Sequence, residues 1–356
     1  MSKIRAAVIF GGTSSEHETS LASAADIIDA LPRDKYEVIC IGITKKGRWL
    51  YYPGDTEGIL NGEWEKDSDC TPAILSPDPI NKGIIKIENG DTSYKRIDVI
   101  FPVLFGRSGE DGTLTGLMNM SGVPYVGSDI SAAAVCMDKA YTRMILGYNG
   151  IKTSNWRMMF RRELNDIDEK CEEFVNELCF PIIVKPANFG SAAGINRTED
   201  FESLKEAIKI ALTHDDKVVV EEFIEGKELQ AAVFGYDAPV ISEIGEVKVS
   251  KAAYDFNDIF SKIDFVIPAE LEDSTSRYIK SMAARAFRLL GCQGLARVDF
   301  YYTPEGEIII SQINAMPEFT RESMYPKLME NMGLSYSILL DKLIEQAMEN
   351  SEGRSV

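Results

Sequence analysis

The chain has 356 residues, of which 45% are hydrophobic and 26% are charged, and its formal net charge at pH 7 is −18. This length suits two or three domains, each with its own core. The negative charge argues against nucleic acid or an anionic membrane as a standing partner, although a local group of lysines and arginines can still bind a nucleotide. Six scattered cysteines and only two histidines argue against a zinc site.

The sequence also carries information about the compartment. No signal peptide precedes the first apolar run, and no segment approaches ~20 consecutive apolar residues. Several cysteines lie within apolar runs, where buried free thiols are the common case. We therefore expect a cytoplasmic protein without a membrane partner.

The N-terminal third has the pattern of an open parallel α/β sheet. Apolar runs at 4–10, 38–43 and 99–104 lack polar alternation, as buried parallel strands do. The first run leads into GGTSSEHETS, which is neither a dinucleotide fingerprint nor a P-loop. Ligands of such sheets bind at the carboxyl ends of the strands. Glu16 and Glu18 in the first helical turn either complement the helix dipole or, for Glu16, face a cation such as a substrate amine.

Two further loops are rich in glycine and small residues. FGRSGEDGTLTG, at 105–116, follows a strand and is placed to face the same cleft. ANFGSAAGI follows a strand at 180–186 that ends in lysine, so its backbone N–H groups are suited to cover phosphates. Residues 245–268 are polar and predict a long mobile loop. A change of character near residue 128 predicts a boundary, and we expect domains at 1–128, 129–240 and 241–356.

The stretch 291–326 predicts a hairpin that carries a polar site. Arg297 and Asp299 share one face of its first strand because alternate residues of a strand point the same way. TPEG forms the turn. Gln312 and Asn314 share one face of the returning strand, so the hairpin brings the four side chains together. Helices are expected before the hairpin, at 274–290, and at the end of the chain, at 335–347.

Several runs resemble, in order and over nearly the whole chain, the D-alanine–D-alanine ligase family of the ATP-grasp fold. They are IFGGTSSEHETSLASA, FPVLFGRSGEDGTLTGL, CMDK, IIVKP…GSAAGI, VVVEEFIEGKE, ARVDFY and INAMPEFT…S..YP. The resemblance implies an α/β (α+β) protein, with an open parallel α/β N-terminal domain followed by an ATP-grasp fold. It implies ATP-dependent ligation of D-alanine to D-alanine or D-serine through an acyl phosphate, for peptidoglycan precursor synthesis. It also implies a homodimer, with ATP and two Mg²⁺ ions, or Mn²⁺, as cofactors.

The resemblance assigns a role to individual residues. Lys139 and Lys185 match lysines that neutralise ATP phosphates, and Glu228 matches the acid that holds the ribose. The matches to the adenine-binding strand are Glu221, Phe223 and Ile224. The matches to the Mg²⁺ ligands are Asp299, Gln312 and Asn314. The matches to catalytic residues are Arg297 for the oxyanion, Glu16 for the first ammonium, Ser191 in the same network, and Ser323 near the second carboxylate.

The chain departs from the family pattern at several of these sites. The residues concerned are Gln312 for glutamate, Ile259 and Phe260 for a Lys-Tyr pair, Phe105 for histidine, Glu318 for glycine, and Ala192 and Ala193 for Ser-Val. Three interpretations follow from these departures. The protein is a D-alanine–D-X ligase with D-alanine, D-serine or a hydroxy acid as X, or an ATP-grasp ligase for other small substrates, or a nucleotide-binding pseudoenzyme.

Overall fold

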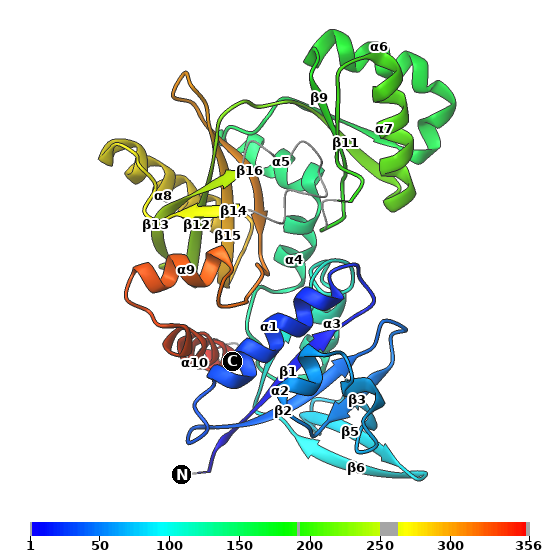
Figure 1. Cartoon of the computed structure of the whole chain (residues 1–356), viewed down its shortest axis with the longest axis vertical. Helices are drawn as coiled ribbons and strands as arrows, with labels where there is room; N and C mark the ends of the chain where they lie inside the picture. The colour runs from blue at the N-terminus through cyan, green and yellow to red at the C-terminus, as the bar shows by residue number, and fades with distance from the viewer. Residues whose placement is uncertain (1, 191–192, 250–262, 354–356) are drawn as a thin grey trace.

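The computed structural model describes residues 2–190, 193–249 and 263–353, which form three β-sheets with helices on their faces (Figure 1). The strands are β1 Ile4–Gly11, β2 Tyr36–Ile43, β3 Trp49–Tyr52, β4 Thr71–Leu75, β5 Gly83–Glu88, β6 Asp91–Arg96, β7 Val99–Val103, β8 Trp156–Phe160, β9 Ile182–Pro186, β10 Asn196–Thr198, β11 Lys217–Glu222, β12 Lys227–Gly235, β13 Val240–Val249, β14 Ile263–Val266, β15 Gly294–Tyr302 and β16 Ile308–Asn314. The helices are α1 His17–Ala30, α2 Thr56–Leu60, α3 Thr113–Ser121, α4 Ile130–Met137, α5 Lys139–Tyr148, α6 Ile167–Leu178, α7 Phe201–His214, α8 Asp273–Leu289, α9 Met324–Asn331 and α10 Tyr336–Gly353, with 3₁₀ helices η1 Trp64–Lys66 and η2 Arg161–Asp166. Within this described part of the chain, no helix combines the length and apolar character that crossing a membrane requires.

The N-terminal sheet has the strand order β6-β5-β4-β3-β2-β1-β7. β1 pairs in parallel with β2 and β7, which confirms the parallel arrangement expected for the three apolar runs. The sheet is not parallel throughout, because β3 to β6 extend it as antiparallel strands. β6 is largely exposed, so no apolar run marks it in the sequence. The tight turn between β5 and β6 permits only antiparallel pairing.

The other two sheets follow each other along the chain. The four-stranded sheet has the order β10-β9-β11-β8, and the five-stranded sheet has the order β14-β13-β12-β15-β16. The helix expected at 274–290 is α8, which packs on β12 and β13 of the five-stranded sheet. The boundary expected after residue 240 falls within β13, directly after its first residue, and β13 pairs with β12. We propose a boundary at 223–226 instead, because that segment joins the two sheets.

The prediction of a long loop at 245–268 is wrong at both ends of this segment, where the structure has strands. β13 extends through Val249 and pairs with β14, with Val247 opposite Phe265. The sequence GEVKV alternates between polar and apolar residues, and this alternation is a strand signal. The middle of the expected loop, 250–262, lies outside the described residues, as do Ile259 and Phe260.

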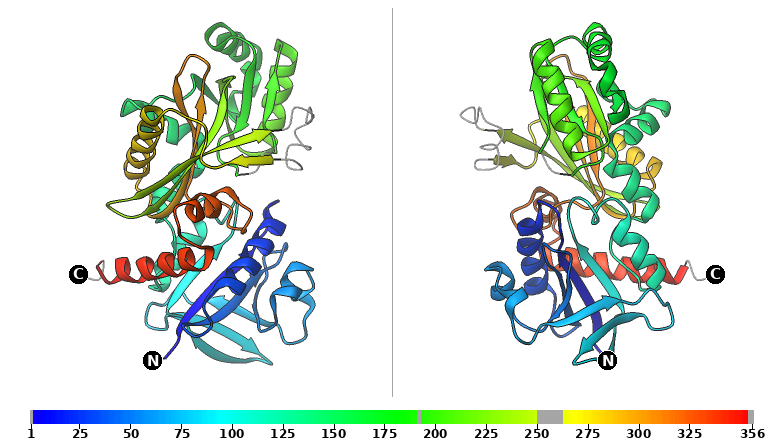
Figure 2. Two further views of the ribbon diagram at one scale, coloured as in Figure 1. Left: turned by 60° about the vertical axis from the view of Figure 1, so that its left-hand side comes forward. Right: turned by 90° about the vertical axis from the view of Figure 1, so that its right-hand side faces the viewer.

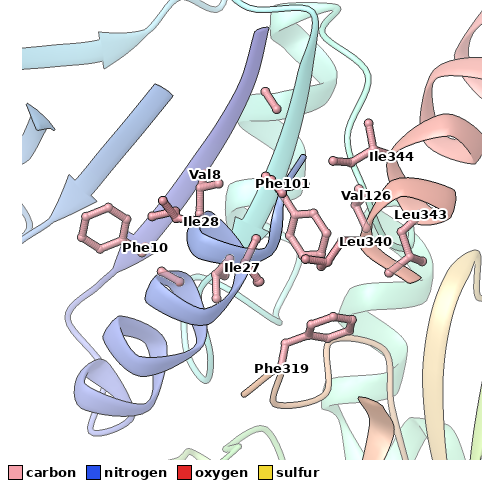
Figure 3. Close-up of a cluster of buried hydrophobic side chains, with 14 of the residues drawn as sticks. Val8, Phe10, Ile27, Ile28, Phe101, Val126, Phe319, Leu340, Leu343 and Ile344 are labelled. Atoms are coloured by element: carbon pink, nitrogen blue, oxygen red, sulfur yellow. The ribbon is translucent and has the colours of Figure 1, made fainter. Parts of the chain in front are cut away.

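The C-terminal segment returns to the N-terminal sheet and closes its core (Figures 2 and 3). α10, the helix expected at 335–347, packs against α1 and β7. Phe319, from the loop after β16, lies 5.7 Å from Phe101 of β7 between ring centroids and is 2% exposed. The Tyr36 hydroxyl of β2 donates to Asp341 of α10 at 2.6 Å. Phe319 therefore anchors the loop after β16 in the N-terminal core, and the bond between Tyr36 and Asp341 ties α10 to β2.

Candidate functional site

A cavity of about 560 Å³ lies where the three sheets approach one another. Its walls come from the start of α1, the loop after β7, helices α4 and α5, and the hairpin β15–β16 with the loop that follows it. Five residues assigned from the sequence line it: Glu16, Lys139, Arg297, Gln312 and Asn314. The cavity therefore collects side chains from segments that are up to 300 residues apart in the chain.

The hairpin supplies a closed polar cluster. Arg297 lies opposite Asn314 and Asp299 lies opposite Gln312, which confirms the pairing expected from residue parity. Nε and Nη2 of Arg297 donate to the two carboxylate oxygens of Asp299 at 2.7 and 2.8 Å. Nε2 of Gln312 donates to Asp299 Oδ2 at 2.7 Å. Both Asp299 oxygens are thus engaged, and the charge-assisted pair holds the buried guanidinium in place.

The proposed metal ligands offer oxygen donors only. Asp299 contributes a carboxylate, and Gln312 and Asn314 contribute amide oxygens, of which Asn314 Oδ1 accepts from the Met316 amide at 2.8 Å. Mg²⁺ commonly takes one or two carboxylates and completes its shell with phosphate oxygens and water, so this donor set fits it. Within the described ranges, no cluster of three or more His, Cys, Asp or Glu side chains has metal-binding geometry.

Glu16 reaches the cavity because the chain turns sharply after β1. Gly11 has a φ of +90°, and a Cβ there would lie 2.2 Å from the Ile43 carbonyl oxygen, so only glycine fits. Glu16 is the N-cap residue of α1, and its Oε2 atom is buried without a hydrogen-bond partner among the described residues. Burial and the nearby charge of Glu318 raise the pKa of Glu16 to about 7.

Glu110, in the loop after β7, lies in the same cavity. Its Oε2 accepts from the Gly106 amide at 2.6 Å. Burial and the charge of Glu16 raise the pKa of Glu110 to about 8. A Cβ at Gly190 would lie 2.8 Å from Glu110 Oε2, so the loop after β9 approaches this carboxylate closely. Two acids with raised pKa values therefore face one ligand space, and the charge of Glu16 disfavours ionisation of Glu110.

Lys139 begins α5 and points into the cavity. Its Nζ donates to the Phe189 carbonyl at 2.7 Å. Burial and the charges of Lys185 and Arg143 lower the pKa of Lys139 to about 8. Among the described residues, no carboxylate lies within ion-pair distance of this ammonium, which suits a group that receives an anionic ligand.

Lys185 and Glu221 belong to a buried ionic cluster beside the cavity. Glu221 of β11 binds Lys185 of β9, accepts from Arg143 Nη2 at 2.5 Å, and accepts from the Ser154 hydroxyl at 2.7 Å. Burial by itself raises the pKa of Glu221, but Arg143 and Lys185 outweigh it and hold this pKa at about 2. The side chain of Glu221 is therefore committed to the protein, and its main chain lies in the sheet between Trp156 of β8 and Ile183 of β9.

The other residues that were expected to bind the nucleotide follow β11. Phe223 is exposed and stacks under the Arg197 guanidinium, 4.3 Å from the ring centroid, while its amide donates to the Pro181 carbonyl at 3.1 Å. Ile224 is partly buried and Glu228, on β12, is exposed. Lys185, Glu221, Phe223, Ile224 and Glu228 are not among the lining residues of the cavity described above.

Ser323 and Ser191 are the two serines that were expected to be catalytic. Ser323 precedes α9, and its hydroxyl lies 2.7 Å from that of Thr320. It is not among the residues that line the cavity. Ser191 lies outside the described residues, together with Ala192. Phe105 is buried in the N-terminal core and also lines the cavity, where the family has a histidine.

Sequence reasoning missed three residues of this region. Glu110 lies in a loop that was expected to face the cleft, so its acidic side chain was a usable signal. Arg143 and Ser154 gave no signal, because a helical arginine and a loop serine are ordinary surface residues until Glu221 is buried between them.

Comparison with known proteins adds to the geometry. The family model described as "D-ala D-ala ligase N-terminus" matches residues 5–128, and that described as "D-ala D-ala ligase C-terminus" matches residues 145–345. A D-alanine--D-alanine ligase of Thermoanaerobacter sp. (strain X514) is 41% identical over 98% of both chains. One of Ruminiclostridium cellulolyticum is 44% identical over 99% of this chain and 97% of the relative.

Solved structures agree with this similarity. The VanG D-Ala:D-Ser ligase from Enterococcus faecalis superposes with a TM-score of 0.88 at 36% identity, covering 97% of this chain and 100% of that chain. The D-alanine-D-alanine ligase from Coxiella burnetii superposes with a TM-score of 0.86 at 29% identity, covering 99% and 96%. The expected fold, an α/β N-terminal domain followed by an ATP-grasp fold, is confirmed. This chain belongs to the D-alanine–D-alanine ligase family.

Proposed function

We propose that the protein joins D-alanine to a second D-amino acid, using ATP, in the synthesis of peptidoglycan precursors. The observation that carries this proposal is the cavity in which Glu16, Lys139 and Arg297 meet. It offers a carboxylate for an ammonium group, an ammonium without a carboxylate partner among the described residues for phosphate, and a fixed guanidinium for an oxyanion. These are the groups that a reaction through an acyl phosphate requires, and the family membership supports the same assignment.

The reaction proceeds in two transfers. A carboxylate oxygen of the first D-alanine attacks the γ-phosphorus of ATP, which gives an acyl phosphate and releases ADP. The amine of the second substrate loses a proton and attacks the acyl carbon, and the tetrahedral adduct expels phosphate. The products are the dipeptide, ADP and phosphate. Catalysis of this kind is mostly positioning and charge neutralisation.

Each cavity residue has a defined part in these steps. Glu16 holds the ammonium of the first D-alanine, which supplies the partner that its buried Oε2 lacks. Arg297, fixed by Asp299, faces the oxygen that becomes negative in the tetrahedral adduct. Lys139 receives phosphate oxygens, because its ammonium has no carboxylate partner among the described residues. Ser191 and Ser323 are proposed to orient the two substrates.

The nucleotide occupies the space between β11, β12 and the loop after β9. Phe223 and Ile224 flank the adenine, at the end of the strand that carries Glu221. Glu228 binds the ribose, and Lys185 binds phosphate after exchanging from Glu221. A bound divalent ion supplies neutralisation of phosphate charge, and Asp299, Gln312 and Asn314 are the residues that hold it. We propose two Mg²⁺ ions, with Mn²⁺ as an alternative.

A phosphate-release panel tests the proposal. We expect purified protein with ATP and Mg²⁺ to release phosphate only when D-alanine is added, and D-serine or D-lactate to change the rate as a second substrate. Glu16→Gln raises the KM for D-alanine, whereas Glu18→Gln, two residues on and paired with Lys45 at the surface, does not. If no amino acid stimulates phosphate release while ATP still raises the melting temperature, the protein binds nucleotide without being a ligase.

We propose a homodimer in the cytoplasm as the working form, on the basis of the family resemblance and of the use of ATP. Neither nucleic acid nor a membrane is expected as a partner, in keeping with the net charge of −18. Sedimentation velocity over a hundredfold range of protein concentration tests the dimer, which is expected to persist at micromolar concentration.

A further inference from the structure

Glu318 lies at a fixed place in the site loop. The next residue, Phe319, is buried in the N-terminal core and its amide donates to the Ser23 hydroxyl at 3.4 Å. Glu318 itself is exposed and lines the cavity. Glu318 lies close enough to Glu16 and Arg297 for its charge to raise the pKa of both groups. Burial has the larger effect on each: it raises the pKa of Glu16 and lowers that of Arg297. The charge of Asp299 also affects the pKa of Arg297 more strongly than Glu318 does.

Glu318 has no counter-ion in this environment. Within the described residues, no lysine, arginine or hydrogen-bond donor contacts its carboxylate. Glu322, in the same loop, contrasts with it, since it pairs with Lys327 at 2.6 Å outside the cavity. Lys327 of α9 therefore pairs with one acid of this loop, and the acid in the cavity has no such partner among the described residues.

The whole cavity has more acids than available cations. Its charged lining residues are Glu16, Glu110, Glu318, Lys139 and Arg297. Arg297 is committed to Asp299 by two hydrogen bonds, and Lys139 faces the Phe189 carbonyl. None of the three glutamates has an ion-pair partner in the described part of the chain. Burial and the charge of Glu16 raise the pKa of Glu110 to about 8, so Glu110 is mostly protonated at pH 7, and a substrate ammonium pairs with Glu16. Glu318 is then the acid of this cavity that lacks a partner among the described residues.

A neutral second substrate fits this charge distribution poorly. The tetrahedral adduct develops negative charge at Arg297, and an uncompensated Glu318 nearby opposes that charge. A cation on the second substrate removes the opposition and gives Glu318 a partner. A charged residue that attracts one class of substrate and is left unpaired by another class makes a binding site specific.

We propose that Glu318 is a specificity-determining residue which selects a second D-amino acid with a cationic side chain, such as an amine or a guanidine. This proposal rests on the proposed ligase function. The first substrate remains D-alanine, held by Glu16. The second binds with its reacting amine toward the acyl carbon near Arg297 and with its side-chain cation on Glu318.

Competition between matched substrates tests this proposal in the full-length protein. With ATP, Mg²⁺ and saturating D-alanine, phosphate release and dipeptide formation are measured with D-lysine, D-ornithine and D-norleucine, with D-alanine alone as reference and L-lysine as a stereochemical control. D-Norleucine matches the carbon chain of D-lysine without its charge. We expect kcat/KM for D-lysine or D-ornithine to exceed that for D-norleucine by about two- to fivefold, the size of an exposed charge pair.

Two variants locate the effect. Glu318→Gln is expected to bring the ratio of D-lysine to D-norleucine close to one, and raised salt to lower the wild-type ratio. Glu322→Gln, a carboxylate in the same loop outside the cavity, is expected to keep the wild-type ratio. Equal use of D-lysine and D-norleucine by the wild type, or an equal loss for every substrate in Glu318→Gln, overturns the specificity role. Failure of D-alanine itself to stimulate phosphate release instead overturns the proposed function.

Discussion

Replacing Gln312 with glutamate tests whether this residue belongs to the proposed metal site, because the substitution adds a negative charge there. In the structure Gln312 Nε2 donates to Asp299 Oδ2 at 2.7 Å, so side chains of the protein supply hydrogen bonds to the Asp299 carboxylate. Glutamate has nearly the same shape but places a second carboxylate against that oxygen. The substitution therefore converts a hydrogen bond into a repulsion that a divalent cation relieves.

The size of the effect follows from the geometry. Two unit charges about 4 Å apart at an effective dielectric constant of ~20 repel by about 4 kcal/mol. Arg297 contacts Asp299 and attracts the new carboxylate as well, so we expect a net cost of about 1–2 kcal/mol without metal. Relief of that cost on binding raises the affinity for Mg²⁺ by about tenfold, since 1.4 kcal/mol is a factor of ten.

Calorimetry measures both parts of this prediction. Titration of Mg²⁺ into the ADP-bound protein gives the metal affinity, and melting in EDTA gives the metal-free stability, which we expect to fall by a few degrees in Gln312→Glu. Gln312→Met is the matched control, because it removes the same hydrogen bond without adding charge and is expected to gain no affinity. Unchanged Mg²⁺ affinity together with unchanged melting in EDTA would refute the assignment of Gln312 to the metal site.

Four further predictions address other parts of the molecule. Glu16 ionises as pH rises through about 7, so kcat/KM for D-alanine in the wild type is expected to rise across that pH and the step to be absent in Glu16→Gln. Arg297→Gln is expected to lower kcat by about 10²–10³ through loss of oxyanion stabilisation, while ADP still raises the melting temperature; an unchanged kcat contradicts this role. The pKa of Glu221 is lowered from 4.5 to about 2, so its stabilisation of about 3 kcal/mol is present above pH 4.5 and is lost as pH falls toward 2. Melting temperature should then fall less steeply from pH 5 to pH 3 in Glu221→Gln than in the wild type. Phe319→Ala is expected to cost about 3–5 kcal/mol in denaturant unfolding, since this fully packed ring joins the site loop to the N-terminal core; a cost below 1 kcal/mol contradicts that anchoring role.

The sequence by itself determined the features that depend on neighbouring residues. Alternation along a strand placed Arg297 with Asp299 and Gln312 with Asn314, and the TPEG turn paired the strands, as the structure confirms. Uninterrupted apolar runs likewise located β1, β2 and β7. These predictions succeeded because the two-residue period of a strand and the chemistry of a turn act within a few residues. The ordered motifs identified the family for the same reason.

Only the tertiary structure decided which distant groups meet. The sequence did not indicate that Glu110 approaches Glu16 closely enough for the charge of Glu16 to raise the pKa of Glu110. It did not indicate that Arg143 and Lys185 bury Glu221 between them, or that Phe319 enters the core of a sheet formed 200 residues earlier. Such contacts depend on how whole sheets pack, because burial and pairing energies arise from surfaces that the chain brings together over long separations. The charge balance of the cavity, and with it the proposed role of Glu318, is a property of that packing.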